Sequence, residues 1–201
     1  MKLPARLACR RKSPPLPNRR WGKLDFNASF TRRIGMLKGT PKAVLNAVCD
    51  RMTLSPGLLT ILPVIKAKGF KTAIISGGLD IFTQRLKERY QLDYAFSNTV
   101  EIRDNVLTDN ITLPIMNAAN KKQTLVDLAA RLNIATENII ACGDGANDLP
   151  MLEHAGTGIA WKAKPVVRKK STIRLIITVS NCFFFLLKMN YNATHLAGRE
   201  F

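Results

Sequence analysis

The sequence predicts an α/β domain in which helices cover a parallel sheet. Two short apolar runs, residues 71–76 and 138–142, each lead directly into a glycine turn and then into a helical pattern. The 46% hydrophobic and 22% charged composition is that of an ordinary globular protein. A chain of 201 residues is long enough for one domain with a substantial core. Ligands of such sheets bind beyond the carboxyl ends of the strands, where both glycine turns fall.

Three helices are expected before the first strand. Residues 25–37 carry apolar side chains at helical spacing, and Gly39 follows as a stop. A second helix is expected over residues 41–52. A third covers residues 58–68 and ends at Gly69. The apolar stripe of the first helix indicates that one of its faces packs against the rest of the protein.

The remaining elements alternate between strands and helices. In chain order we expect a strand at 71–76, a helix at 80–89, short strands within 94–111 around a turn at 104–105, a helix at 120–132, a strand at 138–142, a helix ending near 154, a strand at 156–161 and a new helix from 165. This alternation is typical of strands connected by crossover helices.

The net charge of +17 is concentrated at the two ends of the chain. Residues 1–23 hold eight basic and no acidic side chains, and residues 162–201 hold eight basic and one acidic. Residues 24–161 are nearly balanced, with 15 basic and 13 acidic side chains. We therefore expect a disordered basic leader at 1–23, and we expect no nucleic-acid partner, because such proteins more often carry their charge on a folded docking face.

Neither a membrane span nor a disulfide framework is expected. The longest apolar stretch, residues 175–187, has 13 residues, whereas a helix needs about 20 to cross a bilayer. The four cysteines form no C-x-x-C pair and read as free thiols of a reducing compartment. Together these features predict a cytoplasmic protein.

The strongest local signal for chemistry is the segment GDGAND at residues 143–148, directly after an apolar strand. Its two carboxylates, Asp144 and Asp148, are four residues apart on a strand-to-helix turn and can point into the same space. Carboxylate oxygens suit Mg²⁺, which shares its coordination shell with water and substrate phosphate. The alternative is a tight turn in which Asp144 and Asn147 only cap the next helix.

Two further positions could bind an anion. Ser76 and Gly77 combine a hydroxyl with bare backbone N–H groups at the end of a strand. Lys121 starts the helix that leads to the GDGAND strand, and a phosphate site needs a cation. Taken alone, the first is more often a glycine-rich strand exit and the second a solvated lysine.

In this order the three sites resemble those of phosphoserine phosphatases in the haloacid dehalogenase superfamily. The resemblance extends over roughly 145 residues, from 24 to 168, and is carried by the stretches 24–39, 56–82, 92–98 and 137–168. The GDG-x-ND turn alone also resembles that of cation-pumping P-type ATPases, but those need several membrane spans. The resemblance implies a Rossmannoid three-layer sandwich and four segments: a basic leader at 1–23, a remnant of a helical cap at 24–55, a phosphatase core at 56–168 and an atypical tail at 169–201.

The resemblance also implies a role for each candidate residue. The implied metal ligand for Mg²⁺ is Asp144, with Asp148 ordering the site beside it. Lys121 would neutralise the phosphoryl charge and pair with a carboxylate. The implied phosphate- and substrate-binding residues are Ser76, Gly77, Asn147, Arg33 and Phe26. Phe26 is equally well explained as plain helix packing.

The nucleophile of this family is an aspartate in a D-x-D-x-T turn after a central first strand. Residues 1–23 contain no carboxylate, so we expect negligible phosphate release from the chain as written, as for a truncated reading frame. The resemblance also implies that the strands at 71–76 and 138–142 lose the partner that lies between them. Unpaired backbone groups there would weaken folding by about 1–3 kcal/mol each.

Three functions remain open at this point. The first is Mg²⁺-dependent hydrolysis of O-phospho-L-serine to serine and phosphate, which is the last step of serine biosynthesis, or hydrolysis of another small phosphorylated metabolite. The second is a non-catalytic protein that still binds phosphate or Mg²⁺ through Ser76, Lys121 and Asp144. The third is a nucleic-acid binder driven by the basic ends.

Overall fold

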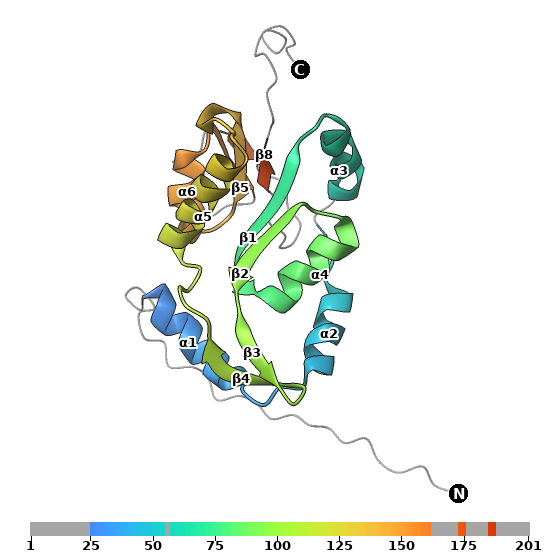
Figure 1. Cartoon of the computed structure of the whole chain (residues 1–201), viewed down its shortest axis with the longest axis vertical. Coiled ribbons are helices and arrows are strands. Elements are labelled where there is room, and N and C mark those ends of the chain that lie inside the picture. The colour runs from blue at the N-terminus through green and yellow to red at the C-terminus, as the bar shows by residue number, and fades with distance from the viewer. Residues whose placement is uncertain (1–24, 55–56, 162–172, 176–184, 188–201) are drawn as a thin grey trace, which may run out of the picture.

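The main sheet contains six strands in the order β2-β1-β8-β5-β6-β7. Figure 1 labels four of them, β2, β1, β8 and β5. The computed structural model describes residues 25–54, 57–161, 173–175 and 185–187. The six strands are β1 Lys71–Leu79, β2 Tyr94–Asn98, β5 Ile139–Gly143, β6 Thr157–Trp161, β7 Ile173–Leu175 and β8 Phe185–Leu187. The pairs β1/β2, β5/β6 and β6/β7 are parallel, which confirms the predicted parallel sheet. Only β8 runs antiparallel to its neighbours in this sheet.

The helices among the described residues match the predicted ones. They are α1 Phe26–Leu37, α2 Lys42–Arg51, α3 Leu58–Ala67, α4 Asp80–Tyr90, α5 Ala118–Arg131 and α6 Leu149–His154. In Figure 1, α5 and α6 lie to one side of β1, and α3 and α4 lie to the other. None of these helices is long and apolar enough to cross a membrane. The helix predicted from residue 165, the leader 1–23 and most of the tail 169–201 lie outside the described residues.

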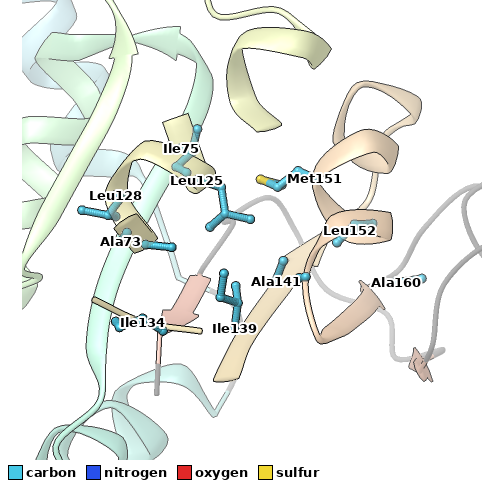
Figure 2. Close-up of a cluster of buried hydrophobic side chains, with 12 residues drawn as sticks. Ala73, Ile75, Leu125, Leu128, Ile134, Ile139, Ala141, Met151, Leu152 and Ala160 are labelled. Carbon is cyan, nitrogen blue, oxygen red and sulfur yellow. The ribbon is translucent and has the colours of Figure 1, made fainter. Parts of the chain in front are cut away.

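The two faces of β1 contribute to two separate hydrophobic clusters, as the two-residue period of a strand requires. Ala73 and Ile75 belong to the larger cluster with α5, β5, α6 and β6 (Figure 2). Ile74 points to the other face and packs with α3 residues. The resulting helix–sheet–helix layering fixes the position of the carboxyl end of β1.

A smaller unit lies beside this sandwich. The hairpin of β3 Val100–Arg103 and β4 Val106–Ile111 packs against α1 in a third cluster that includes Phe30 and Ile34 (Figure 1). Its turn, predicted at 104–105, has positive φ at both Asp104 (50°) and Asn105 (61°). Tight hairpin turns require that conformation, which Asp and Asn tolerate. The hairpin thus forms its own two-stranded sheet, which packs with α1 and with Leu79 at the end of β1.

The strand β8 corrects one expectation. We expected β1 and β5 to lack a partner on the sides that face each other, but Phe185–Leu187 pairs with both. The pairing involves only residues 71–73 of β1 and 139–141 of β5, at the amino-terminal halves of these strands. Beyond them, no strand of the described residues pairs with the facing sides of the carboxyl-terminal halves. The predicted loss of ladder hydrogen bonds is therefore wrong for the amino-terminal halves of both strands.

The amino-terminal end of β1 is held by a partly buried polar contact. The Thr72 hydroxyl and backbone N–H both donate to Asp93 Oδ2 at 2.8 Å, and Lys71 Nζ lies 3.2 Å from Oδ1. Burial by itself raises the pKa of Asp93, but the hydrogen bonds from Thr72 and Lys71 outweigh burial and hold the pKa below its ordinary value of 3.8. The ionised Asp93 therefore stabilises the folded state.

This contact predicts a pH-dependent effect of Asp93→Asn. Because the folded-state pKa is lowered, the stabilisation is present above the unfolded-state pKa of about 3.9 and is lost as the pH falls through the folded value. We expect Asp93→Asn to lower the urea midpoint at pH 7 and to differ progressively less from the parent protein as the pH falls below 4. A difference that stays constant between pH 7 and pH 3 would contradict this account.

Candidate functional site

A buried ion pair lies at the centre of the candidate site. Lys121 Nζ donates to Asp148 Oδ1 at 2.7 Å, and the two side chains are only 2% and 0% exposed. Lys121 lies in the second turn of α5, and Asp148 lies in the short 3₁₀ turn η3 (Ala146–Asp148) after β5. Asp148 Oδ2 also accepts a hydrogen bond from the Gly145 N–H at 3.0 Å. Each charge of the pair thus has a partner, as charges buried this deeply require.

The glycines of the GDGAND turn allow this arrangement. A Cβ on Gly143 would lie 2.6 Å from Asp148 Cβ and 2.9 Å from its Cγ. A Cβ on Gly145 would lie 2.3 Å from Asn147 Oδ1. Because such approaches are too short for real atoms, only glycine lets the turn fold back on Asp148. Asn147 therefore lies against its own turn, and Asp144 lies at its start.

Ser76 and Gly77 lie in a bulge near the carboxyl end of β1. The register with β2 passes from Ile75↔Phe96 to Leu79↔Asn98, so β1 has two more residues than β2 over this span. The Ser76 hydroxyl oxygen accepts a hydrogen bond from the Gly78 N–H at 3.0 Å. We expected the strand to end at Ser76, but β1 continues through the bulge to Leu79. Bulges of this kind redirect side chains next to functional sites.

The bulge contacts both α1 and the segment that leads into α5. An added Cβ on Gly77 would lie 2.8 Å from the tip of the Phe26 ring and 3.4 Å from the Met116 carbonyl oxygen. Phe26 also stacks on Phe30, with the ring centroids 6.2 Å apart. Two predicted site residues, Phe26 and Gly77, are therefore in close proximity.

Arg33 lies on an exposed part of α1. Its Nε donates to the Ser29 carbonyl at 3.3 Å, one helical turn earlier. Among the contacts of the described residues, none joins Arg33 directly to the Ser76 bulge or to the Lys121–Asp148 pair. The structure thus brings together Phe26 with Gly77 and Lys121 with Asp148, whereas Arg33 is exposed on α1 and contacts neither pair among the described interactions.

Parallel strands place Ser76 and Asp144 at the same edge of the sheet. Both β1 and β5 run antiparallel to β8, so they run in the same direction. Ser76 lies near the carboxyl end of β1, and Asp144 directly follows the carboxyl end of β5. Ligands of open α/β sheets bind at this edge.

The donor atoms fit a metal ion that shares its ligands with a substrate better than a closed metal site. No group of three or more His, Cys, Asp or Glu side chains gathers within the described part of the chain. Asp148 binds Lys121 and Gly145, and Asp144, which directly follows the carboxyl end of β5, is the candidate carboxylate ligand. Mg²⁺ characteristically binds through one or two carboxylates together with substrate phosphate and water. The donor set is therefore compatible with Mg²⁺ brought together with a phosphate.

Cys142 is not expected to act as a thiolate nucleophile beside this turn. Cys142 directly precedes the GDGAND turn, and burial raises the pKa of its thiol to about 11. The thiol stays protonated at neutral pH, and a protonated thiol is a poor nucleophile. Cys142 and Cys49 are both free among the described residues, as predicted.

One residue of this region was not singled out in the sequence. Asn98 is 1% exposed, and its side chain bridges Gly77 and Met116. It lies at the end of the stretch 92–98 that contributed to the family resemblance, but a lone asparagine after a strand usually marks a turn. Only the bulge in β1, which the sequence does not reveal, gives this side chain its position.

The match to a protein family decides the classification. The family described as haloacid dehalogenase-like hydrolase matches residues 2–153. The chain belongs to this family. The predicted resemblance to the haloacid dehalogenase superfamily and the predicted α/β fold class are thereby confirmed.

Several individual proteins are similar to this chain over most of its length. Phosphoserine phosphatase of Archaeoglobus fulgidus is 41% identical over 147 residues, which cover 73% of this chain and 43% of that protein. Phosphoserine phosphatase of Methanocaldococcus jannaschii is 35% identical over 152 residues, covering 76% of this chain and 72% of that protein. A crystal structure of a haloacid dehalogenase family hydrolase from Salmonella enterica serovar Typhi is 95% identical, with a TM-score of 0.76, over 77% of this chain and 54% of that one. The chain thus spans less than half the length of the first of these relatives.

Proposed function

We propose that the chain carries the phosphate- and metal-binding part of a phosphomonoesterase that hydrolyses O-phospho-L-serine to L-serine and phosphate. The buried Lys121–Asp148 pair at the carboxyl edge of the sheet is the observation that carries this proposal. A lysine and a carboxylate are expensive to bury, and this pair lies at the edge of the sheet where ligands of such folds bind. The names of the relatives at 35% and 41% identity support phosphoserine as the substrate.

The phosphoryl group would be bound by Ser76, Gly77 and Lys121. Because the Ser76 oxygen already accepts from Gly78, its own O–H is the group left to donate to a phosphate oxygen. Backbone N–H groups in a bulge form an anion-binding concavity. Lys121, oriented by Asp148, would supply positive charge without needing to reorganise.

Asp144 would hold Mg²⁺ at the same edge of the sheet. Its carboxylate is a hard oxygen ligand of the kind that Mg²⁺ prefers. When bound, the ion would neutralise charge on the phosphate oxygens. Asp148 would order the turn beside it through the Gly145 N–H.

The amino-acid part of the substrate would lie between the bulge and α1. Phe26 would pack against the substrate over Gly77, and Asn147 would contribute an amide from the opposite turn. Arg33 would pair with the substrate carboxylate, since a planar guanidinium is suited to two parallel hydrogen bonds.

The substrate assignment is tested by comparing phosphoserine with phosphoethanolamine, which lacks only the carboxylate. In titration calorimetry with Mg²⁺ present, we expect phosphoserine to bind about tenfold more tightly, as one charge-assisted contact of about 1.4 kcal/mol requires. Arg33→Ala should remove this difference in affinity, because it removes the guanidinium that would bind the substrate carboxylate. Arg32→Ala is the matched control, since Arg32 is a neighbouring exposed arginine on the same helix.

Two outcomes would contradict the substrate assignment. One is equal affinity of the parent chain for phosphoserine and phosphoethanolamine. The other is a preference for phosphoserine that survives Arg33→Ala as fully as it survives Arg32→Ala. In both cases a different phosphorylated metabolite would become the better hypothesis.

A further inference from the structure

Asn98 is buried at the junction of the three segments that build the candidate site. It is the last residue of β2, it is 1% exposed, and it faces the bulge in β1. Its Nδ2 donates to the Gly77 carbonyl at 3.0 Å, and its Oδ1 accepts from the Met116 N–H at 2.7 Å. Both polar atoms of the Asn98 side chain therefore form hydrogen bonds, and neither of these bonds belongs to the backbone ladder of the sheet.

The bulge explains why an asparagine is needed here. The two extra residues of β1 move Gly77 out of register with β2, so its carbonyl cannot form a regular ladder bond with that strand. A buried carbonyl without a partner costs about 1–3 kcal/mol. Asn98 supplies the missing donor from its side chain. Because a carbonyl only accepts and an N–H only donates, the orientation of the amide is fixed by its two partners.

The hydrogen bond from the Met116 N–H connects Asn98 to the segment that precedes Lys121. Met116 lies just before Asn117, whose side chain caps α5 by accepting from the Asn120 N–H at 3.0 Å. The Asn120 side chain in turn donates to the Ile115 carbonyl at 2.7 Å. Lys121 follows one helical turn after Asn117, so these bonds set its position. Asn98 thus joins the strand that carries Ser76 to the segment that sets the position of Lys121.

We propose that Asn98 is a positioning residue that fixes the Ser76–Gly77 anion cradle relative to Lys121. The inference rests on the proposed function, because it assumes that the bulge binds phosphate. Asn98 acts through Gly77 and Met116 and does not touch the ligand. The short planar amide of asparagine places a donor and an acceptor side by side; aspartate keeps the acceptor, and leucine keeps neither.

The test compares three forms of the full chain: the parent, Asn98→Asp and Asn98→Ala. Asn98→Asp retains the shape and the bond to Met116 but places a carboxylate oxygen against the Gly77 carbonyl. With inorganic phosphate and Mg²⁺ as the probe, we expect the phosphate Kd to rise about tenfold or more in both variants. The control is Thr72→Val, which removes a buried hydroxyl bonded to Asp93 at the opposite end of β1. It should lower stability and leave the phosphate Kd unchanged.

A second readout needs no ligand. The Gly78 N–H donates to Ser76 Oγ within the bulge, so its hydrogen exchange reports how firmly the cradle is held. In Asn98→Ala we expect exchange of this amide to accelerate about tenfold beyond the change in global stability, and in Thr72→Val to follow global stability alone. If the parent chain binds no phosphate, the proposed function fails, and the exchange rates still decide the role of Asn98. Unchanged Gly78 exchange in Asn98→Ala, or an unchanged phosphate Kd in both variants of a binding-competent chain, would overturn the inference.

Discussion

Replacing Lys121 by methionine is expected to destabilise the protein by about 3–5 kcal/mol, close to the whole stability of a marginal domain. The substitution removes the cation that lies 2.7 Å from Asp148, a side chain with no exposed surface. The Asp148 carboxylate then keeps the hydrogen bond from the Gly145 N–H to its other oxygen, which does not replace the lost positive charge. A buried charge without its counter-ion is far more costly than the pair itself is favourable.

A double-mutant cycle separates this penalty from the value of the pair. Asp148→Leu should be similarly destabilising, because it leaves the lysine buried without its counter-ion. The combined Lys121→Met, Asp148→Leu protein should recover most of the lost stability, since an apolar pair of similar volume avoids the desolvation cost. Urea denaturation of the four proteins measures the coupling. Additive effects of the two substitutions would show that the two charges do not depend on each other.

Gly143→Ala is expected to have the second-largest effect. The new Cβ would lie 2.6 Å from Asp148 Cβ and 2.9 Å from its Cγ, and Cβ is fixed to the backbone and cannot rotate away. Forcing an extra methyl group into a packed interior costs about 1–3 kcal/mol, and here it also displaces Asp148 from Lys121. We therefore expect a lower urea midpoint together with loss of phosphate binding.

Gly35→Ala is the matched control for this substitution. Gly35 lies within α1, where an added Cβ meets nothing within 4 Å and φ is not positive. Alanine is favoured over glycine in a helix by about 0.5–1 kcal/mol, so this variant should be as stable as the parent or more so. If the Gly143→Ala protein were as stable as the Gly35→Ala protein, the turn would have space for a Cβ at residue 143, which would contradict the structure.

The order of elements could be predicted from the sequence because apolar periodicity and glycine positions determine it locally. The strand that precedes Gly143 and the helix that carries Lys121 were both expected where the structure has them. The turn at Asp104–Asn105 was predictable for the same reason, since these residues tolerate positive φ. Signals of this kind depend on neighbours in the chain.

Features that depend on distant segments could not be predicted in this way. The strand β8 comes from a segment that departs from the helix–strand rhythm, and it pairs with residues about 45 and 115 positions away in sequence. The bulge at Ser76–Gly78 appears only when the register of β1 is compared with that of β2. For the same reason Asn98 was not singled out from the sequence, although its side chain bridges two segments in the interior.

The central claim is that Ser76, Lys121 and Asp144 act together on one phosphate and one Mg²⁺. Titration calorimetry of phosphoserine into the full chain, with Mg²⁺ present and after its removal by a chelator, tests this claim most directly. We predict measurable binding that weakens at least about tenfold without Mg²⁺, and that weakens to the same extent in Asp144→Asn with Mg²⁺ present. Phosphoserine affinity that is the same with and without Mg²⁺, or that is unaffected by Asp144→Asn, would contradict the account.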